Sequence, residues 1–290
     1  MPLTAVDRIE ALADALPFIQ KLQGLPLVIK YGGSAMEEEQ IIDRTLRDVA
    51  LLAAVGLKPV IVHGGGKAIS TRMRDAGLKP VFVGGLRLTD YASMRIVANT
   101  LDKVVNPMIV DKLKSAGCKA VGLSGRDYIE AKRSAPVPTN EGLIDLGSVG
   151  DVERVLLDGI HHALERGEVP VMSPIGCDGD GQDLNVNADT VAGATAAALG
   201  AGRLVYISDV PGLMRDPKQA DSLIPSLQSE AIAKLLDDGI IAGGMIPKVE
   251  SALLALSRGV ERAHLIDGRV PHALLMALFT PHGIGTEILP

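Results

Sequence analysis

Two lysines lie beside glycine turns, in an arrangement that suits phosphate binding. Lys30 ends an apolar segment just before Gly32 and Gly33, and Lys248 follows a Gly-Gly-Met-Ile-Pro segment. A further turn, the glycines at 64–66, follows a second apolar segment. Glycine lets backbone N–H groups approach an anion closely, and each lysine ammonium adds a point charge. The pattern predicts a site for a polyphosphate and for a second anion.

A polar cluster precedes the alanine-rich segment at residues 191–199. Asn185, Asn187 and Asp189 stand two residues apart in it. A helix N-cap explains one of these side chains, because capping uses one side-chain oxygen to accept a bond from the first turn. The others are predicted to face a crevice.

Several other kinds of site are excluded or disfavoured. The chain has no G-x-x-x-x-G-K-[ST], no G-x-G-x-x-G and no G-x-S-x-G sequence. Cys118 and Cys177 lie far apart without histidine partners, so we expect buried thiols and no zinc site. The Asp-Gly-Asp-Gly segment at 178–181 is predicted to be a solvated turn. His63 precedes the glycine turn and is predicted to hydrogen-bond the loop, a structural role.

These groups must be positioned by elements that alternate along the chain. Short apolar strands are predicted at residues 27–30, 59–62, 120–123, 170–173, 204–208 and 263–266. Helices are predicted at residues 37–54, 68–76, 91–115, 152–166, 188–199, 230–238 and 246–257. The alternation predicts an α/β fold with a mainly parallel sheet and helices on both faces. Ligands of such sheets bind beyond the carboxyl ends of the strands, where the first two glycine turns lie.

Three further segments depart from this alternation. A helix is predicted at residues 4–22, capped by Thr4 and kinked or interrupted by Pro17. It has no sheet to cover, so it is either a packed helix or an arm that buries its apolar face on another subunit. Residues 132–150 are predicted to hold a hairpin, and residues 175–183 a hinge between two lobes.

Composition restricts the class of protein. The 290 residues are 47% hydrophobic but only 2% aromatic, which predicts an aliphatic core suited to helices on a parallel sheet. Few aromatic rings and a net charge of −6 argue against nucleic-acid binding. No apolar run approaches the ~20 residues of a membrane span, and the start lacks a signal peptide. The sequence therefore predicts a protein with no nucleic-acid or membrane partner that is cytoplasmic, with a mature organellar protein whose targeting segment has been removed as the alternative.

The order of the motifs along the chain resembles that in the amino-acid kinase family and, within it, in the acetylglutamate kinases. The resemblance covers essentially the whole chain, through the segments IKYGGSAM (29–36), VHGGGKAI (62–69), GLRLTD (85–90), NVNAD (185–189), ISDVPGLM (207–214) and GGMIPKV (243–249). It implies a three-layer αβα sandwich with two lobes. An N-terminal helical arm at 1–25 would precede the kinase domain at 26–290, with acceptor-binding and nucleotide-binding lobes at about 26–180 and 181–290.

The resemblance implies transfer of the γ-phosphoryl group of ATP to the side-chain carboxylate of N-acetyl-L-glutamate, the second step of arginine biosynthesis. Lys30 and Lys248 would stabilise the phosphoryl group in transfer, and Asp189 would hold both ammonium groups. The acceptor carboxylate is ionised at neutral pH and needs no general base. The absence of a catalytic histidine dyad is consistent with this chemistry.

Binding residues carry over in the same way. Arg87 would bind the α-carboxylate of the acceptor as a bidentate pair, beside Asn185, Gly65 and Gly66. The resemblance assigns the nucleotide to a larger set: Gly32, Gly33, Gly64, Ser208, Asp209, Gly212, Leu213 and Met245. Mg²⁺ is expected to bridge the ATP phosphates and to be held mainly by them and by water, because no acidic pair is dedicated to it.

The two ends of the chain resemble those of arginine-inhibited, hexameric members, in which the N-terminal helix pairs dimers into a ring. The resemblance implies feedback inhibition by L-arginine and a homo-oligomer, either a dimer or a trimer of dimers. Contacts to arginine would come from Phe18, His264, Asp267, Gly268 and Gly285. Phe18 stands where such proteins often carry tyrosine, so one hydroxyl contact is expected to be missing. The C-terminal part of this resemblance lies in residues 262–269 and 283–286. For these residues, an edge strand and turn of the kinase lobe stays an alternative.

Other functions stay open at this stage. A kinase for a longer acylamino acid such as N-acetylaminoadipate, or for carbamate, would share most of the motifs. A non-catalytic arginine sensor would not need both lysines and Asp189. The sequence carries no information on a signalling-protein partner.

Overall fold

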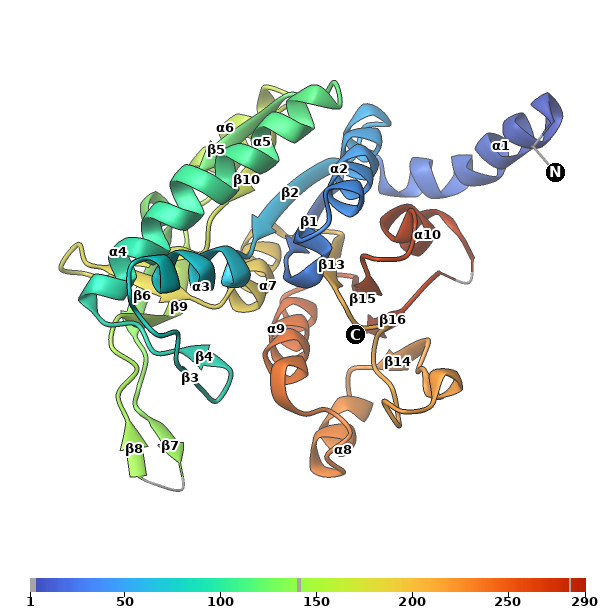
Figure 1. The fold of residues 1–290 in the computed structure, drawn as a ribbon. Coiled ribbons are helices and arrows are strands. Elements are labelled where there is room, and N and C mark those ends of the chain that lie inside the picture. Colours follow the sequence, from blue (N-terminus) through green and yellow to red (C-terminus); the bar gives the residue numbers. More distant parts are fainter. Residues whose placement is uncertain (1–3, 140–141, 282) are drawn as a thin grey trace.

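The computed structural model describes residues 4–139, 142–281 and 283–290, and it is built around an eight-stranded sheet (Figure 1). In spatial order the strands are β14 (Ser226–Gln228), β16 (Thr286–Leu289), β15 (Arg262–Asp267), β13 (Arg203–Ser208), β1 (Pro26–Tyr31), β2 (Lys58–His63), β10 (Val169–Met172) and β5 (Ala120–Leu123). Neighbouring strands are parallel except β15 and β16. The six strands expected from the sequence are the consecutive strands from β15 to β5, so the mainly parallel sheet is confirmed.

Helices cover both faces of this sheet, which makes three layers (Figure 1). One face is covered by α2 (Glu39–Ala54), α5 (Asn106–Ser115) and α10 (Ala273–Phe279). The other is covered by α6 (Asp158–Glu165), α7 (Ala188–Leu199) and α9 (Ile246–Ser257). Successive side chains of a strand point to opposite faces, so Val28 packs on the α7 side and Ile29 on the α2 side. The predicted three-layer fold is confirmed.

The remaining helices border the sheet. They are α3 (Gly66–Asp75), α4 (Tyr91–Thr100), α8 (Ala231–Asp237) and the short 3₁₀ turns η1 (Gly33–Met36), η3 (Gly125–Asp127), η4 (Ala220–Ser222) and η5 (Gly243–Met245). α4 runs into α5 through a π turn, η2 (Leu101–Val105), so the helix predicted at 91–115 is one continuous helical segment. Among the described residues, no helix is long and apolar enough to cross a membrane.

The predicted helix at 152–166 is wrong in its first part. Residues up to 155 belong to strand β9 (Val149–Val155), which pairs antiparallel with β6 (Ile129–Arg133). Together with β11 (Ile175–Cys177) and β12 (Asp183–Val186), these strands close a small barrel. Val149 and Val155 are buried in this barrel. The apolar spacing at 152–163 suggested a helix, but the chain is helical only from the start of α6.

Two hairpins complete the fold. β7 (Val137–Thr139) and β8 (Gly142–Ile144) pair antiparallel, which confirms the hairpin predicted within 132–150. β3 (Phe82–Val83) and β4 (Leu86–Arg87) form a second hairpin, which the sequence did not predict.

The N-terminal helix, α1 (Ala5–Leu22), extends away from the body of the chain (Figure 1). Thr4 caps it as predicted: the Thr4 hydroxyl accepts from the Asp7 N–H at 3.1 Å, and the Asp7 carboxylate accepts from the Thr4 N–H at 2.7 Å. The helix is not interrupted at Pro17. Its outer apolar residues are uncovered, with Ile9 65% and Leu12 66% exposed.

Candidate active site

Lys30 and Lys248 contact the same carboxylate. Lys30 Nζ lies 3.0 Å from Asp189 Oδ1, and Lys248 Nζ lies 2.9 Å from Asp189 Oδ2. Lys248 Nζ also donates to the carbonyl of Gly244 at 3.2 Å. Two ammonium groups share one carboxylate, so the cluster keeps one excess positive charge. The structure therefore brings together the three residues that the sequence marked as catalytic.

The local structure explains this placement. Alternation along β1 turns Lys30 toward α7, the face on which Val28 packs. Asn187 is the N-cap of α7, and its side-chain oxygen accepts from the Asp189 N–H at 2.7 Å. Asp189 is thereby held in the first turn of α7, and Lys248 lies in the first turn of α9.

A close helix crossing holds Lys248 against Asp189. A Cβ added to Gly193 of α7 would lie 2.6 Å from the carbonyl oxygen of Ser251 of α9, so only glycine permits this approach. Ser251 Oγ in turn lies 2.6 Å from the Tyr206 hydroxyl on β13. The crossing thus ties both charged helix starts to the sheet.

The charge of Asp189 is fixed by its surroundings. Burial alone would raise the pKa of Asp189, but the ammonium groups of Lys30 and Lys248 outweigh it and hold that pKa below its usual value. The carboxylate is ionised at neutral pH. It therefore attracts both ammonium groups across the whole physiological range.

The first two glycine turns touch each other beside Lys30. A Cβ added to Gly32 would lie 3.0 Å from Lys30 Nζ and 3.5 Å from the Cα of Gly64. Gly33 has a φ of 70°, in the left-handed region that favours glycine. A Cβ added to Gly65 would lie 2.6 Å from Leu101 Cδ2. Glycine is therefore needed at Gly33 for its backbone conformation and at Gly65 because the Leu101 side chain leaves no room for a Cβ.

A cavity of about 180 Å³ opens beside these turns, between the β3–β4 hairpin and the start of α7. Arg87 is only 6% exposed, and its Nη2 donates to the Gly66 carbonyl and to Ser70 Oγ, both at 2.9 Å. Its guanidinium carbon lies 4.6 Å from the centre of the Phe82 ring. The four residues predicted to bind the acceptor all line this cavity: Gly65, Gly66, Arg87 and Asn185.

Asn185 is held by a short chain of hydrogen bonds. Its Nδ2 donates to Thr89 Oγ1 at 3.1 Å, and the Thr89 hydroxyl donates to the Arg87 carbonyl at 2.7 Å. Each residue of the polar cluster before α7 therefore has a different partner, as expected: Asn185 binds Thr89, Asn187 caps the helix and Asp189 pairs with lysines.

The residues predicted to bind the nucleotide do not all line one cavity, as the acceptor residues do, but lie on several separate turns and loops. Gly32, Gly33 and Gly64 lie at the turns described above. Ser208 ends β13 with a buried hydroxyl that has no partner among the described residues, and Asp209 follows it, exposed. Gly212 lies against Thr286, the Leu213 side chain is buried in the core, and Met245 ends η5 just before α9.

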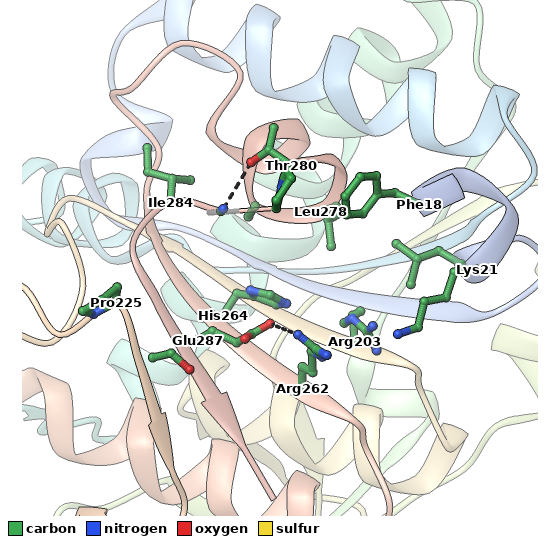
Figure 2. Close-up of a pocket in the computed structure, with 15 residues that line it drawn as sticks. Phe18, Lys21, Arg203, Pro225, Arg262, His264, Leu278, Thr280, Ile284 and Glu287 are labelled. Atoms are coloured by element: carbon green, nitrogen blue, oxygen red, sulfur yellow. Dashed lines mark hydrogen bonds and ion pairs between the residues drawn. The ribbon is translucent and has the colours of Figure 1, made fainter. Parts of the chain in front are cut away.

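A second cavity, of about 350 Å³, lies between α1, α10 and the starts of β13 and β15. Figure 2 shows Phe18 and Lys21 reaching it from α1, with His264 on the opposite wall. Phe18 and His264 were predicted for an effector site. Asp267, Gly268 and Gly285 do not line the cavity: Asp267 pairs with Arg269, and the two glycines pack against neighbouring backbone and side chains.

The walls of this second cavity are strongly polar. Arg262 Nη1 lies 2.7 Å from Glu287 Oε1 (Figure 2), and Arg203 Nη1 lies 2.5 Å from Glu261 Oε2. Burial lowers the pKa of His264 to about 4, so its imidazole is neutral. Its Nε2 is buried without a hydrogen-bond partner among the described residues.

Sequence reasoning missed most of this wall, namely Lys21, Arg203, Arg262 and Glu287. These residues come from one helix and three strands that are remote in sequence, so no spacing connects them. A charged residue at the start of a buried strand, as at Arg203 and Arg262, was the only signal.

No metal site accompanies these groups in the described part of the chain. No cluster of three or more histidine, cysteine or acidic side chains is suitably arranged there. Asp178 Oδ1 accepts from the N–H groups of Asp180 and Gln182, at 3.0 and 2.8 Å, which confirms a turn. Cys118 and Cys177 are free thiols that are only partly buried, so the expectation of full burial is wrong.

Comparison with known proteins agrees with the geometry. The sequence model of the amino acid kinase family matches residues 26–267. Acetylglutamate kinase of Synechococcus elongatus is 44% identical over 287 residues, which cover 98% of this chain and 93% of that protein. Acetylglutamate kinase of Archaeoglobus fulgidus is 44% identical over 290 residues, covering 98% of this chain and all of that protein (100%).

Among solved structures, N-acetylglutamate synthase from Neisseria gonorrhoeae, complexed with coenzyme A and N-acetyl-glutamate, is similar with a TM-score of 0.83 and 25% identity. The match covers 97% of this chain but 63% of that one, so this chain spans less than two thirds of the synthase. The assignment to a family therefore rests on the acetylglutamate kinases, which match this chain over nearly their whole length. The chain belongs to the amino acid kinase family, among the acetylglutamate kinases.

Proposed function

We propose that this enzyme transfers the γ-phosphoryl group of ATP to the side-chain carboxylate of N-acetyl-L-glutamate. The observation that carries the proposal is the Asp189 carboxylate held between Lys30 and Lys248, next to a cavity lined by the glycine turn at 64–66 and by Arg87. In the reaction, an acceptor carboxylate oxygen forms a bond to the γ-phosphorus. The bond from that phosphorus to the bridging oxygen breaks, and ADP leaves.

Charge is the main obstacle to this reaction, since an anionic acceptor must approach an anionic phosphate. Lys30 and Lys248 supply positive charge where the equatorial oxygens of the phosphoryl group would lie. Asp189 fixes both ammonium groups in advance, so little reorganisation is needed during transfer. The acceptor is already ionised, and no protein base takes a proton from it.

The acceptor is assigned to the 180 Å³ cavity. Arg87 would pair with its α-carboxylate, and Asn185 with the backbone of Gly65 and Gly66 would complete the contacts. The nucleotide is assigned to the turns of Gly32, Gly33 and Gly64 and to the loops after β13 and around η5. The acceptor-binding lobe would then span about residues 26–180 and the nucleotide-binding lobe about 181–290.

A magnesium ion would enter with the nucleotide. The described residues contain no acidic cluster for it, and both Asp189 oxygens are occupied by lysines. ATP phosphates and water are therefore expected to hold the ion, which supplies further positive charge to the phosphates.

The test is acyl-phosphate formation from N-acetylglutamate and MgATP, trapped with hydroxylamine. N-acetylaminoadipate and carbamate are run beside it, and a higher kcat/KM for either would reassign the acceptor. Lys248→Ala should lower kcat by roughly 10²–10³-fold, the scale of one preorganised charge contact. Lys234→Ala, at an exposed lysine of α8, is the control. A wild type without any activity would favour the non-catalytic arginine sensor.

We further propose that L-arginine inhibits the enzyme from the second cavity. Glu287 offers a carboxylate for a guanidinium, while Lys21, Arg203 and Arg262 offer charge for an α-carboxylate. Phe18 closes the cavity from α1 without a hydroxyl to donate. Glu287→Gln should weaken arginine inhibition at least tenfold while kcat without arginine stays unchanged. Equal inhibition of wild type and variant would refute this site.

The oligomer is assigned to α1. Its uncovered apolar residues, Ile9 and Leu12 among them, suit burial against the same helix of a second subunit. We propose that this contact joins dimers into a trimer of dimers.

A further inference from the structure

His63 lies at the end of β2, directly before the second glycine turn, and it is fully buried. Its Nδ1 lies 2.9 Å from the carbonyl oxygen of Gly64, and its Nε2 lies 3.2 Å from Asn106 Nδ2. Asn106 Nδ2 also donates to the Val171 carbonyl at 2.8 Å. The imidazole is thus held at both nitrogens, between the glycine turn and helix α5.

These contacts leave the imidazole one tautomer. The Gly64 carbonyl can only accept a hydrogen bond, so Nδ1 must carry the proton. Asn106 Nδ2 can only donate, so Nε2 must be unprotonated. Burial lowers the pKa of His63 to about 4, in agreement with a neutral ring. A ring without charge or free donor is unsuited to acid or base chemistry at neutral pH.

The π turn gives Asn106 this position. The Asn106 N–H donates to the Leu101 carbonyl, the five-residue step that defines a π turn. In a regular α-helix, residues five apart would point about 140° from each other. The wider turn lets Leu101 pack against Gly65 while Asn106 meets His63. Both contacts converge on the same glycine turn.

The bond from His63 to the Gly64 carbonyl also determines where the next N–H points. In a planar trans peptide, the carbonyl of Gly64 and the N–H of Gly65 point in opposite directions. With the carbonyl turned to the imidazole, the Gly65 N–H points away from it. Gly65 lines the 180 Å³ cavity, and no hydrogen bond among the described residues uses its N–H.

We propose that His63, fixed by Asn106 in its Nδ1–H tautomer, is a positioning residue that aims the Gly65 N–H at the reacting anions. The inference rests on the proposed function, since it deepens the role of the glycine turn in phosphoryl transfer. His63 would act only through the peptide and would not touch either substrate.

Two substitutions separate the two ends of the imidazole. In His63→Asn the amide can reproduce the donor at Nδ1, and in His63→Gln it can reproduce the acceptor at Nε2. We expect H63N to retain kcat within about tenfold. H63Q should lose roughly 10²-fold in kcat, the scale of one lost preorganised donor, with a smaller change in KM. His161→Asn, on the exposed side of α6, is the control.

Thermal unfolding and ¹⁵N NMR of the imidazole accompany the kinetics of the full chain. The spectrum of the wild type should show a protonated Nδ1 and an unprotonated Nε2, and the opposite tautomer would overturn the inference. Equal losses of kcat in H63N and H63Q, or losses that follow the fall in melting temperature, would overturn it alone. A wild type that makes no acyl phosphate would overturn the proposed function and this inference with it.

Discussion

Asp189 illustrates how much a single side chain determines at this site. Each of its oxygens forms an ion pair with one ammonium group, and Lys30 and Asp189 are both less than a tenth exposed. A buried ion pair contributes little net stability, but removing one partner leaves the other charge uncompensated. The cluster therefore couples folding to the charge arrangement needed for transfer.

Asp189→Asn should affect both properties. The amide keeps the volume but not the charge, so Lys30 and Lys248 repel each other without a counter-ion. We expect kcat to fall by at least ~10²-fold and the free energy of unfolding to fall by about 3–5 kcal/mol. Steady-state kinetics and urea unfolding measure the two effects.

Asp238→Asn is the matched control, because Asp238 pairs with Lys234 on the surface of α8. Its loss should stay below about 1 kcal/mol. If Asp189→Asn were as mild as this control, the ion-pair cluster would have no catalytic importance.

Two buried histidines make stability depend on pH. Burial lowers the pKa of both His63 and His264 to about 4, from an ordinary value of about 6.5. Between these values the unfolded chain binds protons that the folded chain does not. The free energy of unfolding should thus fall as pH falls from 6.5 to 4, by up to about 1.4 kcal/mol per pH unit for each histidine.

Urea unfolding of wild type and His264→Gln at several pH values from 7 to 4.5 tests this expectation. The variant cannot titrate at position 264, so its stability should fall less steeply below pH 6.5. Parallel curves for the two proteins would show that burial does not lower the pKa of His264 in the folded chain.

At the level of elements, the sequence predicted the centre of the fold better than its borders. The strands from β15 to β5 are apolar on both faces. Each therefore appears in the sequence as a short continuous apolar run, with glycine or proline near its ends. β3, β14 and β16 have only two to four residues, too few for a recognisable apolar pattern, and β14 also lies at the edge of the sheet. β9 was mistaken for a helix because its apolar residues also fit a helical period.

The site divides in the same way. Lys30, Lys248 and the glycines lie at predicted strand or helix ends, so their positions followed from the element pattern. Asn106 was missed because its role depends on a π turn, and the spacing of apolar residues does not reveal a π turn within a helix. The charged wall of the second cavity was missed because it assembles from remote segments.

The crossing of α7 and α9 can be tested directly. A Cβ at Gly193 would lie 2.6 Å from a backbone oxygen, so Gly193→Ala must push the helices apart. We expect a loss of about 1–3 kcal/mol in unfolding free energy. A lower kcat is also expected, since the shift would move Lys248 away from Asp189.

Gly179→Ala is the control, because an added Cβ there meets nothing within 4 Å. Kinetics and urea unfolding of both variants suffice. A Gly193→Ala protein with the stability and kcat of the wild type would show that the helix contact is not tight.

At the scale of the whole molecule, the exposed apolar residues of α1 are best explained by contact with another subunit. It extends from the body of the chain (Figure 1), yet its inner end closes the second cavity through Phe18 and Lys21 (Figure 2). Assembly through α1 would therefore also affect the shape of the proposed arginine site.

Ile9→Asp combined with Leu12→Asp should reduce the oligomer without unfolding the subunit. Both residues are about two-thirds exposed in the chain itself, so their replacement costs the subunit little. Light scattering coupled to gel filtration should show a dimer in place of the larger assembly. Glu10→Gln, also exposed on α1, is the control. An unchanged mass for the double variant would remove α1 from the interface.

Strand β13 runs from the second cavity to the loops assigned to the nucleotide. Arg203 at its start lines the second cavity, and Ser208 at its end lies beside the loops assigned to the nucleotide. Six residues of extended backbone measure roughly 20 Å from end to end. An occupant of the second cavity is therefore too distant to overlap sterically with a nucleotide bound beside the end of β13. Raising the nucleotide concentration would not displace it by direct competition, so any inhibition must act through a change in conformation.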